Sequence, residues 1–146
     1  MDPMALLTLI GSGLGLVDKF YDLAMKVEGQ TPGQHSVTVD TSDDKLVITD
    51  HGHAQEISAD ELELSAFDQA RHDALKKRID ILWAQYNAID VARASAAPDE
   101  KARLKVQMVA LEGELCPDFR RVVRMYEMVL RRSLPDHYTL YEICPG

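Results

Sequence analysis

The sequence predicts a mainly α protein with a long antiparallel helical hairpin plus an N-terminal helix, and with a small two- or three-stranded antiparallel β-meander inserted. Three observations predict this fold class. Residues 4–27 are apolar and then amphipathic, residues 35–57 are rich in β-branched and turn-forming residues, and residues 59–134 carry apolar stripes with steps of three and four. Hydrophobic residues make up 46% of the 146 residues and charged residues 27%, so we expect one folded domain over residues 1–146.

One helix is predicted over residues 4–27, because a mostly apolar start, Met4 to Val17, continues into a segment with apolar residues at helical spacing. Gly29 and the Thr31-Pro32-Gly33 run are expected to end this helix. As a helix, the apolar start would span about 21 Å, which is less than the roughly 30 Å hydrocarbon core of a bilayer. A single-pass membrane anchor is therefore not expected.

A small antiparallel meander is predicted next. Two β-branched runs, Val37–Val39 and Leu46–Thr49, are expected to be strands, with a turn between them at Ser42–Lys45. A third short strand at Ala54–Ile57 would complete a three-stranded version of the sheet.

A helical hairpin is predicted after the meander. Its first helix is expected over residues 59–96, with Ser58 and Glu61 at the spacing of a capping box. Pro98 begins the returning helix, and Pro117 is expected to kink that helix or to begin a new one. The apolar stripes expected to face each other are Leu75, Ile79, Leu82, Tyr86 and Ile89 on the first helix, and Leu104, Met108, Leu111, Leu115, Phe119, Val122, Tyr126 and Val129 on the second.

The helical region is expected to end at Leu134, and the aromatic tail over residues 135–146 to pack back on the helices. Cys116 and Cys144 are expected to be free thiols, because two cysteines make neither a disulfide framework nor a zinc site. The sequence leaves open whether these two cysteines meet. With no secretory signal evident at the start, the expected location is the cytoplasm.

The charge is unevenly distributed along the chain. The net charge is −8, but residues 1–65 hold 12 acids and 3 bases, whereas residues 66–146 hold 12 acids and 13 bases. The first part is expected to repel nucleic acid and anionic membranes, so only the second part offers a surface for an anionic partner. Nucleic acid is therefore not expected as a partner.

The segment Gly11-Ser12-Gly13-Leu14-Gly15 imitates a dinucleotide-binding turn, with Ala5–Ile10 as the preceding strand and Asp40 near a ribose-binding position. Its spacing is G-x-G-x-G rather than G-x-G-x-x-G, and no later alternation of strands and helices supplies a parallel sheet. A helix whose glycines permit close approach of a neighbour is the preferred interpretation. Nucleotide binding or a small enzyme built on this segment remains the second alternative.

No metal or cofactor is expected. His51 and His53 are close in sequence to Asp50, and His35 could join them across the meander, but a metal needs three or four converging ligands. A polar turn is the preferred interpretation. The acidic residues that could bind calcium, without the spacing of an EF-hand loop, are Asp40, Asp43, Asp44 and Asp50.

No enzyme is expected either. Asp68, His72 and Asp73 lie close together on one predicted helix, but no serine or cysteine motif supplies a nucleophile for a histidine–aspartate pair. The Cys116 thiol before Pro117 is interpreted as a buried structural residue.

Two surfaces are candidates for interaction. The first is the only dense basic cluster, formed by Arg120, Arg121, Arg124, Arg131 and Arg132, which would attract an acidic partner or a phosphate. The second is the N-terminal helix, through Leu6, Leu7, Ile10, Gly11, Gly13, Leu14, Gly15, Val17 and Phe20.

The function expected from these surfaces is a non-catalytic protein–protein interaction or oligomerisation module, an adaptor or regulatory component of a larger assembly. The partner would be another protein or a second copy of the chain. The alternative is a membrane-acting effector whose N-terminal helix enters lipid after activation.

Overall fold

The computed structural model describes residues 1–29, 37–42 and 44–144 of the chain. These residues form three α-helices and one antiparallel sheet, which confirms the predicted fold class. The elements are α1 (Pro3–Val27), β1 (Val37–Ser42), β2 (Lys45–Asp50), β3 (His53–Ser58), α2 (Gln69–Ala94) and α3 (Pro98–Leu130), with 3-10 turns at Ala59–Glu61, Leu64–Ala66 and Asp136–Thr139.

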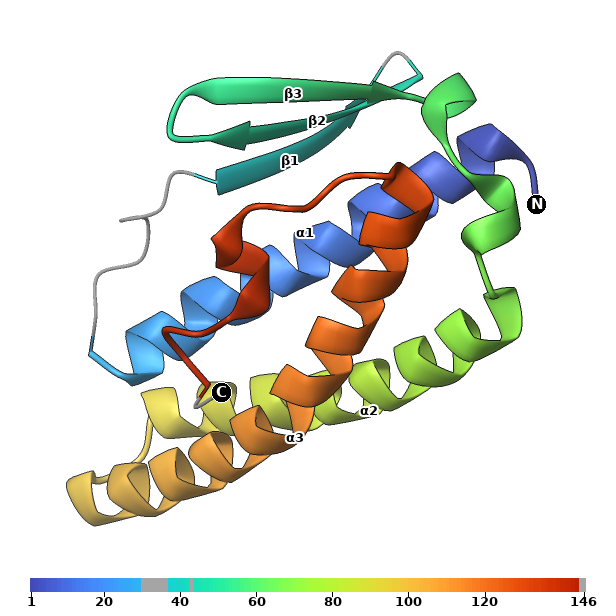
Figure 1. Cartoon of the computed structure of the whole chain (residues 1–146). Coiled ribbons are helices and arrows are strands. Elements are labelled where there is room, and N and C mark those ends of the chain that lie inside the picture. Colours follow the sequence, from blue (N-terminus) through green and yellow to red (C-terminus); the bar gives the residue numbers. More distant parts are fainter. Residues whose placement is uncertain (30–36, 43, 145–146) are drawn as a thin grey trace.

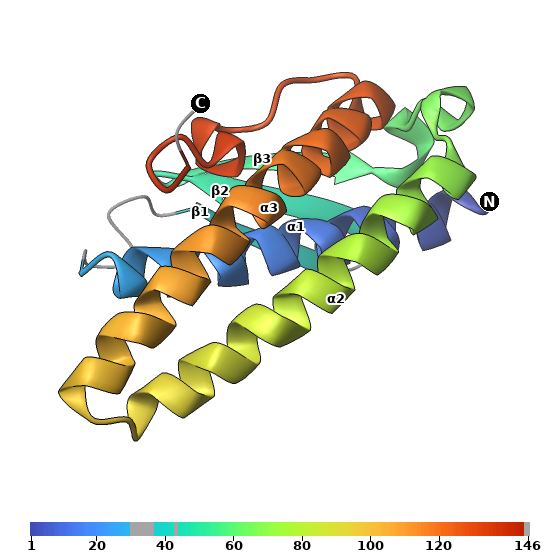
Figure 2. The ribbon, with the colours of Figure 1, turned by 90° about the horizontal axis from the view of Figure 1, so that it is seen from below.

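Helix α1 lies at the centre of the molecule, between the sheet and the α2–α3 hairpin (Figure 1). Figure 2, seen from below, shows α2 and α3 crossing α1 on the side away from the sheet. Both sides of α1 are therefore covered, and its core side chains include Leu7, Ile10 and Leu14, all with no exposed surface. A helix that is apolar around most of its circumference is typical of such a central position.

The sheet is a meander in the order β1-β2-β3, with both pairs antiparallel. Leu46 and Ile48 of β2 and Ile57 of β3 are buried, whereas the residues between them on β2 and β3 are more exposed. This alternation is typical of a sheet that packs one face on the core. The three predicted strands are confirmed, and the expected helix stop at residues 31–33 lies outside the described residues.

The start of the hairpin differs from the prediction, because α2 begins at Gln69 rather than near residue 59. The capping box forms, with the backbone N–H of Ser58 donating to Glu61 Oε2 at 2.7 Å, but it heads only a 3-10 turn. Asp68 is the actual N-cap of α2, since its carboxylate accepts the backbone N–H of Arg71 at 3.1 Å.

Backbone bonding explains the late start of α2. The N–H of Glu63 donates to the carbonyl oxygen of Val129 in α3 at 2.8 Å. This donor is therefore used between segments and not within a helix of residues 59–68, so the segment crosses the end of α3 as two short turns.

Helix α3 runs through Pro117 without ending, and Figure 1 shows that it changes direction near its middle. A proline inside a helix removes one backbone hydrogen bond and bends the helix, which agrees with the predicted kink. Helix α3 ends at Leu130, four residues before the predicted limit, and Arg131, with φ of 60°, caps it in the left-handed region. The expected stripe on α3 is buried along its whole length.

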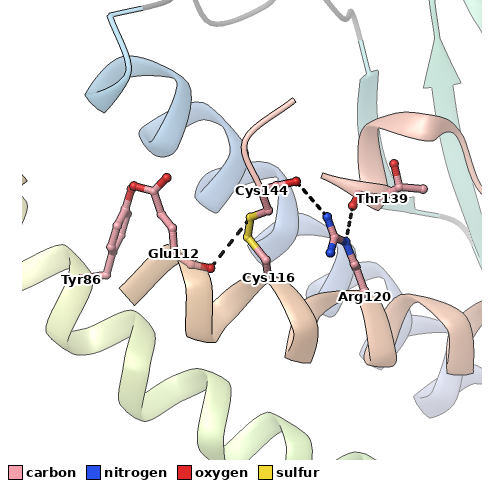
Figure 3. The surroundings of a disulfide bond; sticks show 6 residues. All are labelled: Tyr86, Glu112, Cys116, Arg120, Thr139 and Cys144. Carbon is pink, nitrogen blue, oxygen red and sulfur yellow. Dashed lines mark hydrogen bonds between the residues drawn. A yellow bond between two sulfur atoms is a disulfide. The ribbon is translucent and has the colours of Figure 1, made fainter. Parts of the chain in front are cut away.

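The tail packs back on the helices, as predicted. Tyr138 and Leu140 are fully buried, and the His137 ring nitrogen Nε2 lies 2.7 Å from Asp18 Oδ1 on α1. The prediction of free thiols is wrong, because Cys116 and Cys144 form a disulfide between α3 and the tail (Figure 3). The tail is thus fastened covalently to α3 and by polar contacts to α1.

Candidate docking surface

The five predicted arginines lie on the second half of α3 or directly after it, but they have different partners. Arg120 supports the tail: its guanidinium donates to the carbonyl oxygens of Thr139 at 2.8 Å and Cys144 at 3.1 Å (Figure 3). It also lies 5.4 Å from the ring centroid of Tyr141. This side chain therefore holds the fold and orients Tyr141.

Two more of the arginines are paired with carboxylates. Arg121 donates to the fully buried Asp118 at 3.0 Å, and Arg78 of α2 approaches the other oxygen of the same carboxylate at 3.3 Å. Arg132 lies 3.5 Å from Glu61 in the turn before α2. These pairs connect α3 to α2 and to the segment before it.

Arg124 and Arg131 are different, because both are exposed and neither has a carboxylate within ion-pair distance in the described part of the chain. The charge of Arg131 is still felt by Glu63: the pKa of that carboxyl is lowered, first by a hydrogen bond from Ser65 and then by Arg131. Two cations thus remain available on this face for an external anion.

Two large apolar side chains are exposed beside these cations. Met128 is 64% exposed and Tyr141 is 67% exposed. Open grooves connect the four residues: one contains Arg124, Met128 and Arg131, and the adjoining groove contains Arg124 and Tyr141. We call these four residues, Arg124, Met128, Arg131 and Tyr141, the C-terminal docking surface.

One acid lies within this face, and it forms no ion pair with the arginines among the described residues. Glu127 lines both grooves, but its carboxylate accepts the backbone N–H of Leu134 at 2.7 Å, which fixes the chain reversal after α3. The sequence indicated the arginines of this surface but not Met128 or Tyr141. The sequence could have indicated Met128, because this apolar residue falls outside the apolar stripe of α3.

The predicted surface on the N-terminal helix is inside the molecule. The predicted side chains are buried, together with Gly11 and Gly13, and Gly15 is half-buried. Gly11 lies against Thr41 of β1, and Gly13 lies against the hydroxyl of Tyr126 in α3. The glycines therefore allow close approach of α1 to its neighbours, and any binding through the apolar face of α1 requires this helix to leave the core.

The dinucleotide-like segment lies within the same helix, α1. Ala5–Ile10, the strand that such a site requires, is helical and continuous with the glycines in α1. Asp40 is exposed on β1, in the predicted antiparallel meander and not in the parallel sheet that a dinucleotide-binding unit requires.

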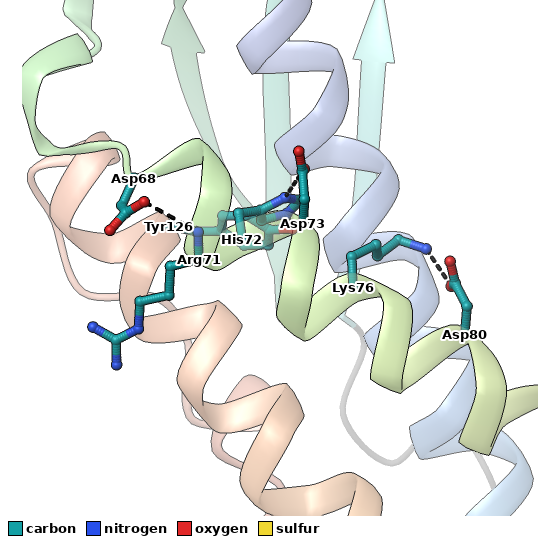
Figure 4. Close-up of polar contacts among 7 residues, drawn as sticks. All are labelled: Asp68, Arg71, His72, Asp73, Lys76, Asp80 and Tyr126. Atoms are coloured by element: carbon teal, nitrogen blue, oxygen red, sulfur yellow. Dashed lines mark hydrogen bonds and ion pairs between the residues drawn. The ribbon is translucent and has the colours of Figure 1, made fainter.

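The predicted histidine–aspartate group is a packing element (Figure 4). His72 is buried, with Nε2 at 2.9 Å from the Tyr126 hydroxyl and Nδ1 at 3.4 Å from Asp73. Burial raises the pKa of Tyr126. Because Gly13 lies against the same hydroxyl, this contact joins all three helices.

No group of three or more potential metal ligands occurs among the described residues. His51 pairs with Asp50 at 2.6 Å, and His53 is exposed on β3. His35 and Asp43, which were candidates for metal and calcium sites, lie outside the described residues.

Glu112 is a buried acid that the sequence did not indicate. It is 3% exposed, accepts a hydrogen bond from the Tyr86 hydroxyl at 3.1 Å, and its backbone oxygen lies 3.8 Å from Cys144 Sγ (Figure 3). Burial raises the pKa of this carboxyl to about 7.

Replacement of Glu112 by glutamine is therefore expected to stabilise the protein at pH 8 by about 2 to 3 kcal/mol and to change little at pH 4. The folded state holds the Glu112 proton more tightly than the unfolded chain does, so wild-type stability falls as the pH rises from about 4.5 to about 7. Urea unfolding at both pH values measures the difference, with the exposed Glu114→Gln as control. An equal pH dependence in all three proteins would contradict this assignment.

Comparisons with family models, curated proteins and solved structures gave no match.

Proposed function

We propose that the protein is a non-catalytic interaction module that binds an acidic, partly apolar protein segment on the C-terminal docking surface. The observation that carries the proposal is the combination of two exposed apolar side chains, Met128 and Tyr141, with two exposed arginines, Arg124 and Arg131, that have no ion-pair partner in the described chain. Aromatic, methionine and arginine side chains are the residue types enriched where proteins bind one another.

The surface is also rigidly supported. Arg120 fixes the carbonyl oxygens of the tail and lies over Tyr141, the disulfide holds Cys144, and Glu127 fixes the turn after α3. A preordered surface loses less conformational entropy when it binds. Because the net charge of the chain is −8, a basic face such as this one is favoured as the site where an acidic partner binds.

Selection from a random peptide library tests the proposal. Peptides selected on the wild-type protein are expected to combine Asp or Glu with Leu, Phe or Trp. Their affinity, measured by fluorescence anisotropy, is expected to fall about tenfold or more in the double variant Arg124→Gln/Met128→Ser. The double variant Arg103→Gln/Val106→Ser is the control, because it makes the same two changes at exposed positions near the other end of α3. Selected peptides without acidic residues, or equal losses in both variants, would refute this binding mode.

A membrane-acting effector is the second candidate, favoured by one observation. Helix α1 has 25 residues and a mean hydropathy of 1.3 over an 18-residue window, so its length and composition suffice to cross a bilayer. Core helices and signal sequences meet the same criterion, and half of that window is buried here. Flotation of the full chain with vesicles separates the two functions: the interaction module is expected to stay unbound, and the effector to bind vesicles and release a trapped dye.

A further inference from the structure

A second basic group lies far from the docking surface, where the last turn of α1, the C-terminal half of α2 and the first turns of α3 meet. These segments border an open pocket of about 370 Å³. Figure 1 shows this junction at the end of the molecule where the hairpin turns. The lining residues are Lys26, Asp90, Arg93, Ala94, Lys101, Ala102 and Lys105, and we call this site the lysine pocket.

The charges of the lysine pocket are not balanced by the protein. Arg93 pairs with Asp90 at 3.2 Å, and both side chains of this pair are largely buried. Within residues 1–29, 37–42 and 44–144, no carboxylate lies at ion-pair distance from Lys26, Lys101 or Lys105. Three lysines therefore line one pocket without an ion-pair partner among the described residues, in a chain whose net charge is −8.

Repulsion between two of these lysines has a local consequence for α3. Lys101 and Lys105 are separated by one helical turn, and like charges at this spacing destabilise a helix. Lys105 lowers the pKa of the Glu112 carboxyl, but burial outweighs this effect and raises that pKa to about 7, so Glu112 offers only part of a negative charge at neutral pH. An external anion in the pocket would remove the repulsion and would be held by several charge-assisted hydrogen bonds.

The walls indicate the kind of anion. Ala94 and Ala102 are small and leave space between the ammonium groups, and the lining contains no aromatic or large apolar side chain. These features suit compact, multiply charged phosphates. A groove that shares Lys26 and Asp90 with the pocket continues along α1 and α2 past Asn87 and Trp83. That groove offers an aromatic ring and an amide to a group attached to the phosphates.

We propose that the lysine pocket binds the polyphosphate group of a small anion, either inorganic polyphosphate or a nucleoside triphosphate whose remaining part lies along the groove at Trp83. This site is independent of the glycine segment in α1 and of the C-terminal docking surface. The protein would then be responsive to a small phosphate ligand at one end of α3 while it binds a partner at the other.

Calorimetry of the full chain with tripolyphosphate, and separately with ATP, at constant ionic strength and without divalent cations tests the proposal. Saturable binding is expected for the wild type. The double variant Lys101→Gln/Lys105→Gln is expected to lose about tenfold or more in affinity for tripolyphosphate. The control variant Lys45→Gln/Lys77→Gln removes the same charge from exposed positions outside the pocket and is expected to stay within about twofold of the wild type.

The two sources of phosphate are distinguished by the single tryptophan. A change in Trp83 fluorescence with ATP but not with tripolyphosphate, together with tighter binding of ATP, would assign the ligand to nucleotides. Equal affinities and unchanged fluorescence would assign recognition to the phosphates alone. The pocket variant is expected to unfold at the same temperature as the wild type or above it, since it relieves the repulsion between Lys101 and Lys105. Absence of saturable binding, or equal losses in the pocket and control variants, would overturn the proposal.

Discussion

Replacement of Gly13 by alanine is expected to lower the free energy of unfolding by about 2 to 3 kcal/mol, whereas Gly15→Ala is expected to raise it by up to about 1 kcal/mol. A methyl group at position 13 would overlap the hydroxyl and ring atoms of Tyr126. That ring cannot move aside easily, because it is fully buried and bonded to His72 at 2.9 Å. A methyl group at position 15 meets no atom within 4 Å, so only the gain in helix propensity remains.

The two substitutions are matched, since both add one methyl group to the same helix two residues apart. Urea unfolding followed by circular dichroism gives the difference between them. Gly11→Ala is expected to be milder than Gly13→Ala, because the nearest atom at position 11 is the hydroxyl oxygen of the exposed Thr41, which can rotate away. Equal stabilities for the Gly13 and Gly15 variants would show that α1 does not approach α3 as closely as described.

Loss of the disulfide is expected to have an effect of similar size. The Cys116–Cys144 bond closes a loop over a sequence separation of 28 residues, and a cross-link of that length restricts the unfolded chain by about 3 to 4 kcal/mol. Cys116→Ser/Cys144→Ser, or reduction of the wild type, should therefore lower the free energy of unfolding by about that amount.

The effect should also reach the C-terminal docking surface. Without the bond, Cys144 loses its covalent link to α3, and the carbonyl oxygens that Arg120 holds are less firmly placed. Unfolding in urea with and without dithiothreitol measures the stability, and the serine variant, which has no thiol, serves as the control that dithiothreitol leaves unchanged. If the untreated native protein had two titratable thiols and its stability did not respond to dithiothreitol, the Cys116–Cys144 disulfide would be contradicted.

The sequence was sufficient for the parts of the fold that depend on local periodicity. The stripes from Leu75 to Ile89 and from Leu104 to Val129 have the helical repeat, and both are on the packed faces of α2 and α3. The signal at Ser58 and Glu61 was real but ambiguous, because a capping box can begin a 3-10 turn as well as a long helix. The competing bond from Glu63 to Val129 joins segments far apart in the chain, so no local pattern contains it.

For the candidate sites, too, the sequence indicated what is local in the chain and missed what depends on contacts between distant segments. The arginines were visible as a cluster because they are neighbours in the sequence, but their partners were not. Arg120 and Arg121 are occupied by the tail and by Asp118, whereas Arg124 is not paired with a carboxylate in the described residues. The lysine pocket could not be predicted, because it collects residues from three separate helices. Likewise, the path of the tail decides whether Cys116 and Cys144 meet, and this path depends on tertiary packing.

The central position of α1 has a consequence for biosynthesis. This helix is synthesised well before Tyr126 and the tail, which complete its surroundings. Until then its apolar side chains have only the meander and α2 to cover them. Contacts between the two ends of a chain form slowly and expose apolar surface on nascent chains. The nascent protein is thus expected to depend on chaperones until α3 and the tail have emerged.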